Sequence, residues 1–130
     1  MKVMTKNGAP RYQRDQITSH LLVSKRTCDA ENLAITLVEM EPGGRQHVHS
    51  HEPEQMYYIL EGSGIMTVDG EQRQVNAGDC VFYPAFAEHG LENTGGSILR
   101  YLSAASPSFT LKTCQEWWPL PSIDQAREED

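Results

Sequence analysis

Two histidines, His47 and His49, lie one residue apart in a sequence that contains five histidines. In an extended strand, side chains two residues apart project from the same face, so both imidazoles can reach one metal ion. A further histidine, His89, follows a proline-containing bend in the stretch 78–93, GDCVFYPAFAEHGLEN. Spacing alone leaves two explanations of the His47/His49 pair open, which are metal ligation and ordinary packing in a core.

The elements that must position these histidines have the pattern of β-strands. Short apolar runs rich in Val, Ile, Tyr, Phe and Leu alternate with Gly, Pro, Asn and Asp clusters about every ten residues. Turn sequences such as Asp69-Gly70 supply the positive φ that tight hairpins need. The pattern predicts an all-β sandwich or barrel with strands over residues 17–24, 33–40, 45–49, 55–60, 64–70, 71–75, 80–84, 87–92 and 97–104.

The chain length predicts one domain, because 130 residues build a single core. We expect an N-terminal arm over residues 1–16, the barrel over 17–112 and a C-terminal tail over 113–130. Trp117 and Trp118 fall in that tail, outside the barrel pattern, where a loop or dimer contact is expected rather than a substrate role.

Composition excludes several partners and compartments. The net charge is −7 and no basic run exceeds Lys25-Arg26, which argues against nucleic acid. No apolar run approaches the roughly 20 residues of a membrane span, and the N-terminal residues lack the apolar core of a signal peptide. Three widely spaced cysteines argue against a disulfide framework. We therefore expect a cytoplasmic protein whose partner is a small molecule.

The two histidine segments together resemble the cupin superfamily, whose motifs are G-x5-HxH-x3-4-E-x6-G and G-x5-P-x-G-x2-H-x3-N. The second motif matches Gly78, Pro84, His89 and Asn93, and only Phe86 departs, standing where glycine is usual. The first matches His47-Val48-His49 and Gly62, and fifteen residues separate the motifs. The resemblance implies a small single-domain cupin of the cupin-2 type, with a double-stranded β-helix (jelly-roll) barrel, and a homodimer. The fold hosts many reactions, so it does not identify one.

Metal ligation by His47, His49 and His89 is what the resemblance implies, with Mn, Fe, Ni or Zn as the divalent ion. The fourth ligand is ambiguous, because counting forward from His49 selects Glu54 and counting back from Gly62 selects Gln55. An extra residue in the loop 50–53 disturbs less than one inside a strand, where it would flip every later side chain. This argument favours Gln55, with Glu54 on the opposite face, although a bulge would reverse it.

Three imidazoles and an amide would leave the ion its full charge and make it a strong Lewis acid. Proton transfer would then fall to a group outside the ligand set. The candidates are His51, Glu54 and Tyr57, followed by Tyr83 and Tyr101. For His51 an exposed loop histidine, or one that supports the ligands, is favoured over a metal ligand, although the family's variation allows either.

A substrate pocket is predicted by strand alternation, although most of its members are also explained as ordinary core. Arg45 shares the face of His47 and is a candidate carboxylate anchor, or else a surface residue. The full predicted lining is Arg45, Ile59, Phe82 (or its neighbour Tyr83), Phe86, Leu91 and Tyr101.

Two classes of function follow from these predictions. The first is a metal-dependent enzyme, an isomerase or lyase that polarises a carbonyl of a sugar, uronate or oxo-acid, with an Fe(II) dioxygenase as a close variant. The second is a non-catalytic cupin that binds a small ligand or a metal. Three intact histidine positions favour the enzyme, because buried histidines without a metal are costly.

Overall fold

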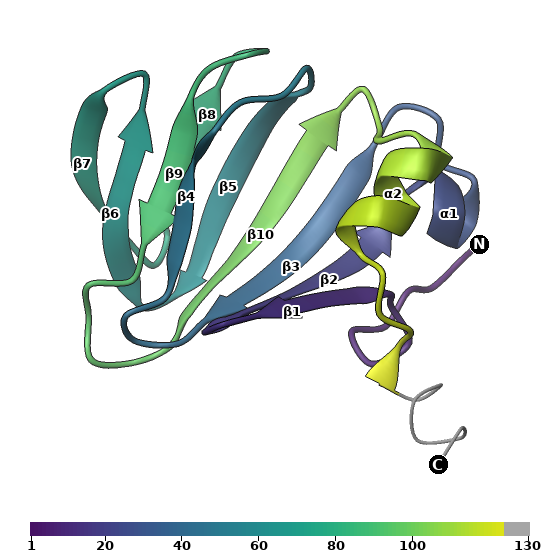
Figure 1. Cartoon of the computed structure of the whole chain (residues 1–130), viewed down its shortest axis with the longest axis horizontal. Coiled ribbons are helices and arrows are strands. Elements are labelled where there is room, and N and C mark those ends of the chain that lie inside the picture. Colours follow the sequence, from purple (N-terminus) through teal and green to yellow (C-terminus); the bar gives the residue numbers. More distant parts are fainter. Residues whose placement is uncertain (124–130) are drawn as a thin grey trace.

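Two antiparallel sheets form the body of the computed structural model, which describes residues 1–123 (Figure 1). One sheet has six strands in the order β1-β2-β3-β10-β5-β8, and the other has four in the order β4-β9-β6-β7. The strands are β1 (Arg11–Arg14), β2 (Ile17–Val23), β3 (Ala34–Met40), β4 (Arg45–His49), β5 (Glu54–Glu61), β6 (Ser63–Val68), β7 (Glu71–Asn76), β8 (Cys80–Tyr83), β9 (His89–Glu92) and β10 (Leu99–Ser106). The predicted all-β class is therefore confirmed.

All nine predicted strands are present, and the sequence pattern missed one more. Strand β1 has the sequence RYQR, which shows no apolar alternation, yet it pairs antiparallel with β2 at the edge of the six-stranded sheet. The segment predicted as an N-terminal arm, residues 1–16, thus contributes a strand. Where a polar strand pairs on one side only, its partner strand fixes it rather than its own hydrophobicity.

Strand β5 carries the alternation on which the fourth-ligand prediction depended. Gln55, Tyr57 and Ile59 are buried, whereas Glu54 and Tyr58 are exposed. Because successive side chains of a strand point to opposite faces, the buried set lies inside the barrel. The predicted register of β5 is confirmed.

Strand β4 departs from regular alternation. Gln46 pairs with Leu91 of β9, but the next pair along the strand is His49 with His89, so β4 advances three residues while β9 advances two. This is a β-bulge, in which an extra residue of one strand has no partner on the other. Because of the bulge, the side chains of Gln46 and His49 point to the same face of the sheet. The side chains of His47 and His49 therefore no longer share a face.

Two helices close one end of the barrel and lie side by side there (Figure 1). Helix α1 (Lys25–Cys28) begins at Ser24, whose side chain accepts from the Thr27 amide. Helix α2 (Leu111–Trp117) begins at Thr110, which caps the amide of Thr113 in the same way. A second apolar cluster forms beneath them, from Leu21, Ala34, Ala105, Phe109, Cys114 and Trp118.

The predicted C-terminal tail is consequently in part a packed element, and its residues 124–130 lie outside the described residues. Trp118 is buried and donates from Nε1 to Ser19 Oγ at 3.1 Å. Leu120 pairs with Arg11 of β1 through backbone hydrogen bonds. Within residues 1–123, no helix is long and apolar enough to cross a membrane.

Gly62, which ends β5, shows why the motif needs glycine at this position. Its φ is +85°, and a Cβ there would overlap the carbonyl oxygen of Ile98. Only glycine combines a left-handed backbone with so close an approach. This turn fixes where β5 ends and hence which of its residues face inward.

Candidate metal centre

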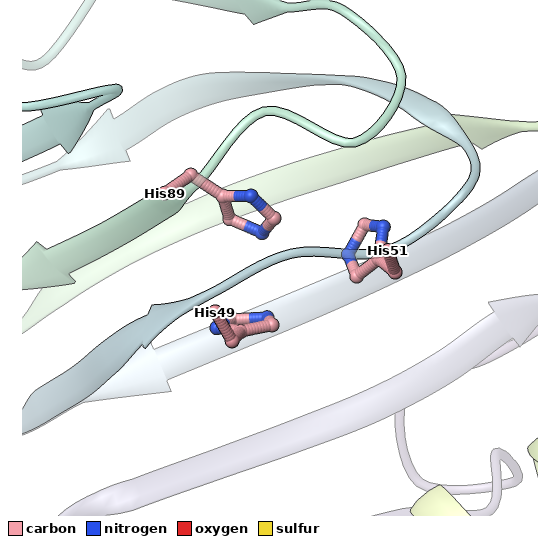
Figure 2. Close-up of side chains that lie close together, drawn as sticks. All are labelled: His49, His51 and His89. Atoms are coloured by element: carbon pink, nitrogen blue, oxygen red, sulfur yellow. The ribbon is translucent and has the colours of Figure 1, made fainter.

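Three histidines from separate positions converge at one end of the barrel, as Figure 2 shows. His49 ends β4, His51 lies in the loop between β4 and β5, and His89 begins β9. One ring nitrogen of each lies within 4.8 Å of those of the other two. The centroid of His89 is 4.4 Å from that of His49 and 4.8 Å from that of His51. Three imidazole nitrogens at this separation can ligate a single ion.

His47, predicted as a ligand, is not part of this cluster. Its side chain is exposed and lines the outer part of the cavity, while its carbonyl oxygen accepts a hydrogen bond from His49 Nδ1 at 2.8 Å. The reason is the bulge in β4, which removes the same-face relation assumed for residues 47 and 49. His51 takes the place that the sequence analysis gave to His47.

The corrected set also changes how the first motif fits. Gly43 is followed by five residues, then His49-Ser50-His51, three residues, Gln55, six residues and Gly62. This is the full cupin spacing, and the extra loop residue inferred earlier does not exist. Anchoring the motif on Gly43 as well as Gly62 would have found it.

The protonation states of the histidines suit metal ligation. His49 Nδ1 and His89 Nδ1 donate to the carbonyls of His47 and Ala87, at 2.8 and 3.0 Å, which leaves the Nε2 lone pair of each ring free. Burial lowers the pKa of His89 to about 4, and burial followed by the neighbouring His49 lowers the pKa of His51. At neutral pH both rings are uncharged, which is the form that binds a metal.

Buried atoms without partners test whether a metal fits this cluster. His89 Nε2 and His51 Nδ1 are buried and have no hydrogen-bond partner. The same is true of Gln55 Oε1, while Gln55 Nε2 donates to Ser103 Oγ at 2.5 Å. An unpaired buried polar atom costs about 1 to 3 kcal/mol, and several in one place indicate a missing ligand. The nitrogen and oxygen donors fit a divalent ion.

The backbone around the cluster holds the two histidine loops together. The Phe86 amide donates to the His51 carbonyl at 2.9 Å, which ties the loop before β5 to the loop before β9. Phe86 has a φ of +65°, the left-handed region in which glycine, usual here in the cupin motif, is unstrained. Its side chain is 67% exposed and lines neither cavity of the site, so a pocket role for Phe86 stays a prediction.

Two connected cavities lead to the cluster. The inner cavity, about 90 Å³, is lined by His49, His51 and Gln55 together with Ser19, Thr36, Val38, Gln46, Tyr57, Tyr101, Ser103, Phe109, Trp117 and Trp118. The outer cavity, about 490 Å³, shares Gln46, His49 and Tyr101 with it and is also lined by Tyr12, Arg14, Asp15, Ile17, Arg45, His47 and Glu116. The outer volume falls within the range typical of small-molecule sites.

The structure places the other predicted residues in three groups. Tyr57 and Tyr101 line the inner cavity and Arg45 lines the outer one, as expected of pocket residues. Ile59 and Leu91 are fully buried in the apolar core and line neither cavity, so alternation placed them inside the barrel but below the site. Two predictions are wrong because the side chains lie on the outer face of the six-stranded sheet, namely Phe82, which is 62% exposed, and Glu54.

Four tyrosine and histidine rings form the wall behind the cluster. The ring of Tyr83 stacks on that of His89 with the ring centroids 4.0 Å apart. The ring centroids of Tyr57 and Tyr101 are 4.5 Å apart. Burial raises the pKa of Tyr57 and of Tyr101, so both hydroxyls remain protonated. They act as neutral hydrogen-bond donors and do not supply a base near neutral pH.

Sequence reasoning missed the aromatic cover supplied by the C-terminal segment. Trp117 and Phe109 lie 5.9 and 6.0 Å from the ring of His51, and both line the inner cavity. For Trp117 and Trp118 a loop or dimer contact was expected rather than a substrate role, and the structure places both in the lining of the inner cavity. The two adjacent tryptophans in an otherwise polar segment could have indicated this contact, because large apolar side chains in such a segment tend to pack on the barrel.

Comparison with known proteins identifies the family. The model of the cupin domain matches residues 36–105, which is more than half of the chain and includes all three clustered histidines. The chain belongs to the cupin family, and its two sheets form the double-stranded β-helix of that fold.

Its relatives carry several activities. An oxalate-binding protein from Thermotoga maritima is 34% identical over 86 residues, 65% of this chain and 70% of the relative. The dimethylsulfoniopropionate lyase DddW from Ruegeria pomeroyi is 35% identical over 69 residues, 53% of this chain and 45% of the relative. An uncharacterised protein from Methanocaldococcus jannaschii is 36% identical over 81 residues, 62% of this chain and 63% of the relative. The chain thus spans less than two thirds of the last two relatives.

Among solved structures, the crystal structure of a predicted oxalate decarboxylase from Thermotoga maritima superposes with a TM-score of 0.72. It covers 82% of this chain and 99% of that one at 24% identity. At this identity the likeness supports the fold alone.

Proposed function

We propose that this cupin is a divalent-metal-dependent enzyme that acts on a small oxygen-rich substrate such as a sugar, uronate or oxo-acid. The observation that carries the proposal is the cluster of His49, His51 and His89, together with the unpartnered Oε1 of Gln55, which lines the inner cavity with His49 and His51. We assign these four side chains as the metal ligands. A divalent ion held by four neutral groups keeps its full charge and serves as a Lewis acid toward a carbonyl or hydroxyl oxygen.

The surrounding residues of the chain bind and orient the substrate. The inner cavity presents the hydroxyls of Ser19, Thr36 and Ser103, and Trp117 and Phe109 exclude water from one side. Arg45 stands at the rim of the outer cavity, where its guanidinium can hold a carboxylate of a longer substrate. Isomerisation or elimination next to a carbonyl is the reaction class that such a site suits best.

The experiment is a substrate panel assayed with the metal-loaded protein. The protein is stripped with chelator, reloaded separately with Mn, Fe(II), Ni or Zn, and incubated with unsaturated uronates, ketoses and oxo-acids under nitrogen. The expected result is metal-dependent turnover without oxygen that is lost in Gln55→Leu. Turnover that requires oxygen and Fe(II) would instead indicate the dioxygenase.

A non-catalytic binder is the second candidate, and one observation favours it. No aspartate or glutamate of residues 1–123 lines the inner cavity, and the carboxylates of Asp15 and Glu116 line only the outer one. The oxalate-binding relative is consistent with such a role. Tight metal-dependent binding of an oxo-acid without turnover under any metal would favour the binder over the enzyme.

We further propose that the protein is a homodimer formed through the outer face of the six-stranded sheet. Cross-strand pairing aligns Leu37, Leu102 and Tyr58 in one row, and Met56 with Phe82 in the next. Tyr58 and Phe82 are 41% and 62% exposed, and exposed apolar rows of this kind can pair with a second copy. Sedimentation should give a dimer for the natural chain and a monomer for Leu102→Arg, and a monomeric natural chain would contradict the proposal.

A cytoplasmic location is also proposed. The three cysteines are free, with Cys80 exposed to solvent. Exposed thiols persist in a reducing compartment. Fractionation of the native host, with a fluorescent fusion as a second readout, tests this location.

A further inference from the structure

Gln46 occupies a special position at the mouth of the inner cavity. It lies beside the bulge of β4, and together with His49 it lines both the inner and the outer cavity. Its side-chain oxygen Oε1 accepts two hydrogen bonds, from Tyr57 Oη at 3.0 Å and from Tyr101 Oη at 3.2 Å. Two donors on one oxygen fix the orientation of the amide.

The fixed orientation leaves the amide nitrogen for a ligand. A glutamine side chain has one acceptor oxygen and one NH₂ group with two protons to donate. The Nε2 of Gln46 has no hydrogen-bond partner within residues 1–123, and the residue is only half-buried. Its two N–H bonds are therefore available to a molecule in the cavity.

Two serine hydroxyls of the inner cavity can also donate. Ser19 Oγ accepts from Trp118 Nε1 at 3.1 Å, and Ser103 Oγ accepts from Gln55 Nε2 at 2.5 Å. Each hydroxyl keeps its own proton for a further partner, because a hydroxyl both accepts and donates. No carboxylate of the described chain lines this cavity, so once the metal takes the imidazole nitrogens and Gln55 Oε1, the remaining groups that face a ligand are mainly donors.

The volume limits what can occupy it. About 90 Å³ corresponds to roughly three water molecules, each of which takes about 30 Å³ of the liquid. That space accepts a head group such as a carboxylate or enolate, with the rest of the ligand in the outer cavity of about 490 Å³.

We propose that Gln46 is a specificity-determining residue whose amide N–H groups donate to an anionic oxygen of the ligand, so that the site selects small carboxylates or enolates over neutral analogues. The inference rests on the proposed function, since the metal supplies the second anchor for the same ligand.

The test compares pyruvate with its neutral amide, pyruvamide, by titration calorimetry on the metal-loaded protein. In Gln46→Glu, a carboxylate oxygen can still accept from both tyrosines, but the donor is replaced by a negative charge. Gln46→Met removes the donor without adding charge. Gln72→Glu, at an exposed position on β7, makes the same charge change far from the site and serves as the matched control.

We expect the natural chain and Gln72→Glu to bind pyruvate at least about tenfold more tightly than pyruvamide. Losing a hydrogen bond to a charged group should weaken pyruvate binding roughly tenfold to hundredfold in Gln46→Met, and further in Gln46→Glu, with metal content unchanged and pyruvamide affected less.

Equal pyruvate affinity in Gln46→Met and the natural chain, or no preference for pyruvate in the natural chain, overturns the inference while the metal site stands. If Gln46→Glu loses metal, Gln46→Met alone decides. A natural chain that takes up no metal overturns the proposed function and this inference with it.

Discussion

Two buried histidines on opposite sides of the barrel wall, His20 and His89, have very different surroundings. His20 is 1% exposed and lies with Nε2 3.3 Å from Glu39, a carboxylate that also meets Lys6 and Arg100 at 2.8 Å. His89 is 0% exposed and, like His20, has its Nε2 without a hydrogen-bond partner, but it faces two further imidazoles instead of a carboxylate.

The difference teaches how to recognise a ligand histidine. A histidine buried beside a carboxylate that is itself paired with cations belongs to a structural network on the outer face of the sheet. The unpartnered nitrogen of His89 instead faces other histidines, and no carboxylate of the described chain lines the inner cavity beside them. Such a buried nitrogen stabilises the protein only when it binds a ligand such as a metal ion. Burial alone therefore does not distinguish a structural histidine from a metal ligand, but the variants described below do.

The largest expected effect is a difference in metal affinity between the His89 and His20 variants. His89→Ala should weaken binding of a divalent ion more than about 100-fold, because a ligand is lost rather than a supporting group. His20→Ala should leave metal affinity unchanged. Metal titration with a competing chelator measures both, and His49→Ala, at an exposed ligand, repeats the test without a cavity in the core. Equal metal affinity in the His20 and His89 variants would remove the distinction.

The next effect concerns the fourth ligand. Gln55→Leu should lower metal affinity about tenfold to hundredfold, because it removes the amide oxygen. Losing a group that orients the ligands of a metal has an effect of about this size. Glu54→Leu, one residue earlier and on the exposed face, is the control and should bind metal like the natural chain. The opposite outcome, with metal lost only from the Glu54 variant, would show that the β5 register is not what selects the ligand.

The pH dependence of stability should expose the buried imidazole of the site. Because the folded pKa of His89, about 4, lies below the ordinary 6.5, the unfolded chain binds more protons between these values. Stability is therefore complete above pH 6.5 and falls as the pH decreases toward 4, by about 2 kcal/mol at pH 5 for this group. Urea unfolding of chelator-treated protein at pH 7 and pH 5 measures this loss.

His89→Asn should flatten that pH profile by the same amount, whereas His47→Asn, at an exposed histidine outside the cluster, should not change it. A profile equally steep in His89→Asn would assign the proton uptake elsewhere.

The smallest effect is expected in the outer network. Glu39→Gln weakens the pairing with Lys6 and Arg100, both partly exposed, so the free energy of unfolding should fall by only about 1 kcal/mol. Metal affinity should stay the same, since the network lies on the opposite side of β3. A loss of metal in this variant would mean that the two sides are coupled.

Sequence patterns predicted the regular parts of the molecule well. All nine expected strands are present, and the alternation of β5 correctly separated Gln55 from Glu54, because strand periodicity is a local property. The second cupin motif selected His89, which the structure places in the histidine cluster.

The failures lie where nonlocal pairing decides. The bulge in β4 depends on how β9 pairs with it, and it moved the ligand role from His47 to His51. The role of Trp117 depends on the C-terminal segment folding back over the barrel, which no local pattern encodes. Strand β1 has no apolar alternation, and it forms because it pairs with β2, so its own sequence did not predict it.

The most direct test of the metal centre is the metal content of two variants four residues apart in the sequence, His51→Ala, at the ligand found in the structure, and His47→Ala, at the ligand predicted from the sequence. Each is purified, stripped with chelator, reloaded with Ni or Zn and analysed for bound metal per chain. We predict one ion per chain in the natural protein and in His47→Ala, and almost none in His51→Ala. Metal retained by His51→Ala and lost from His47→Ala would contradict the assignment of His49, His51 and His89 as the centre.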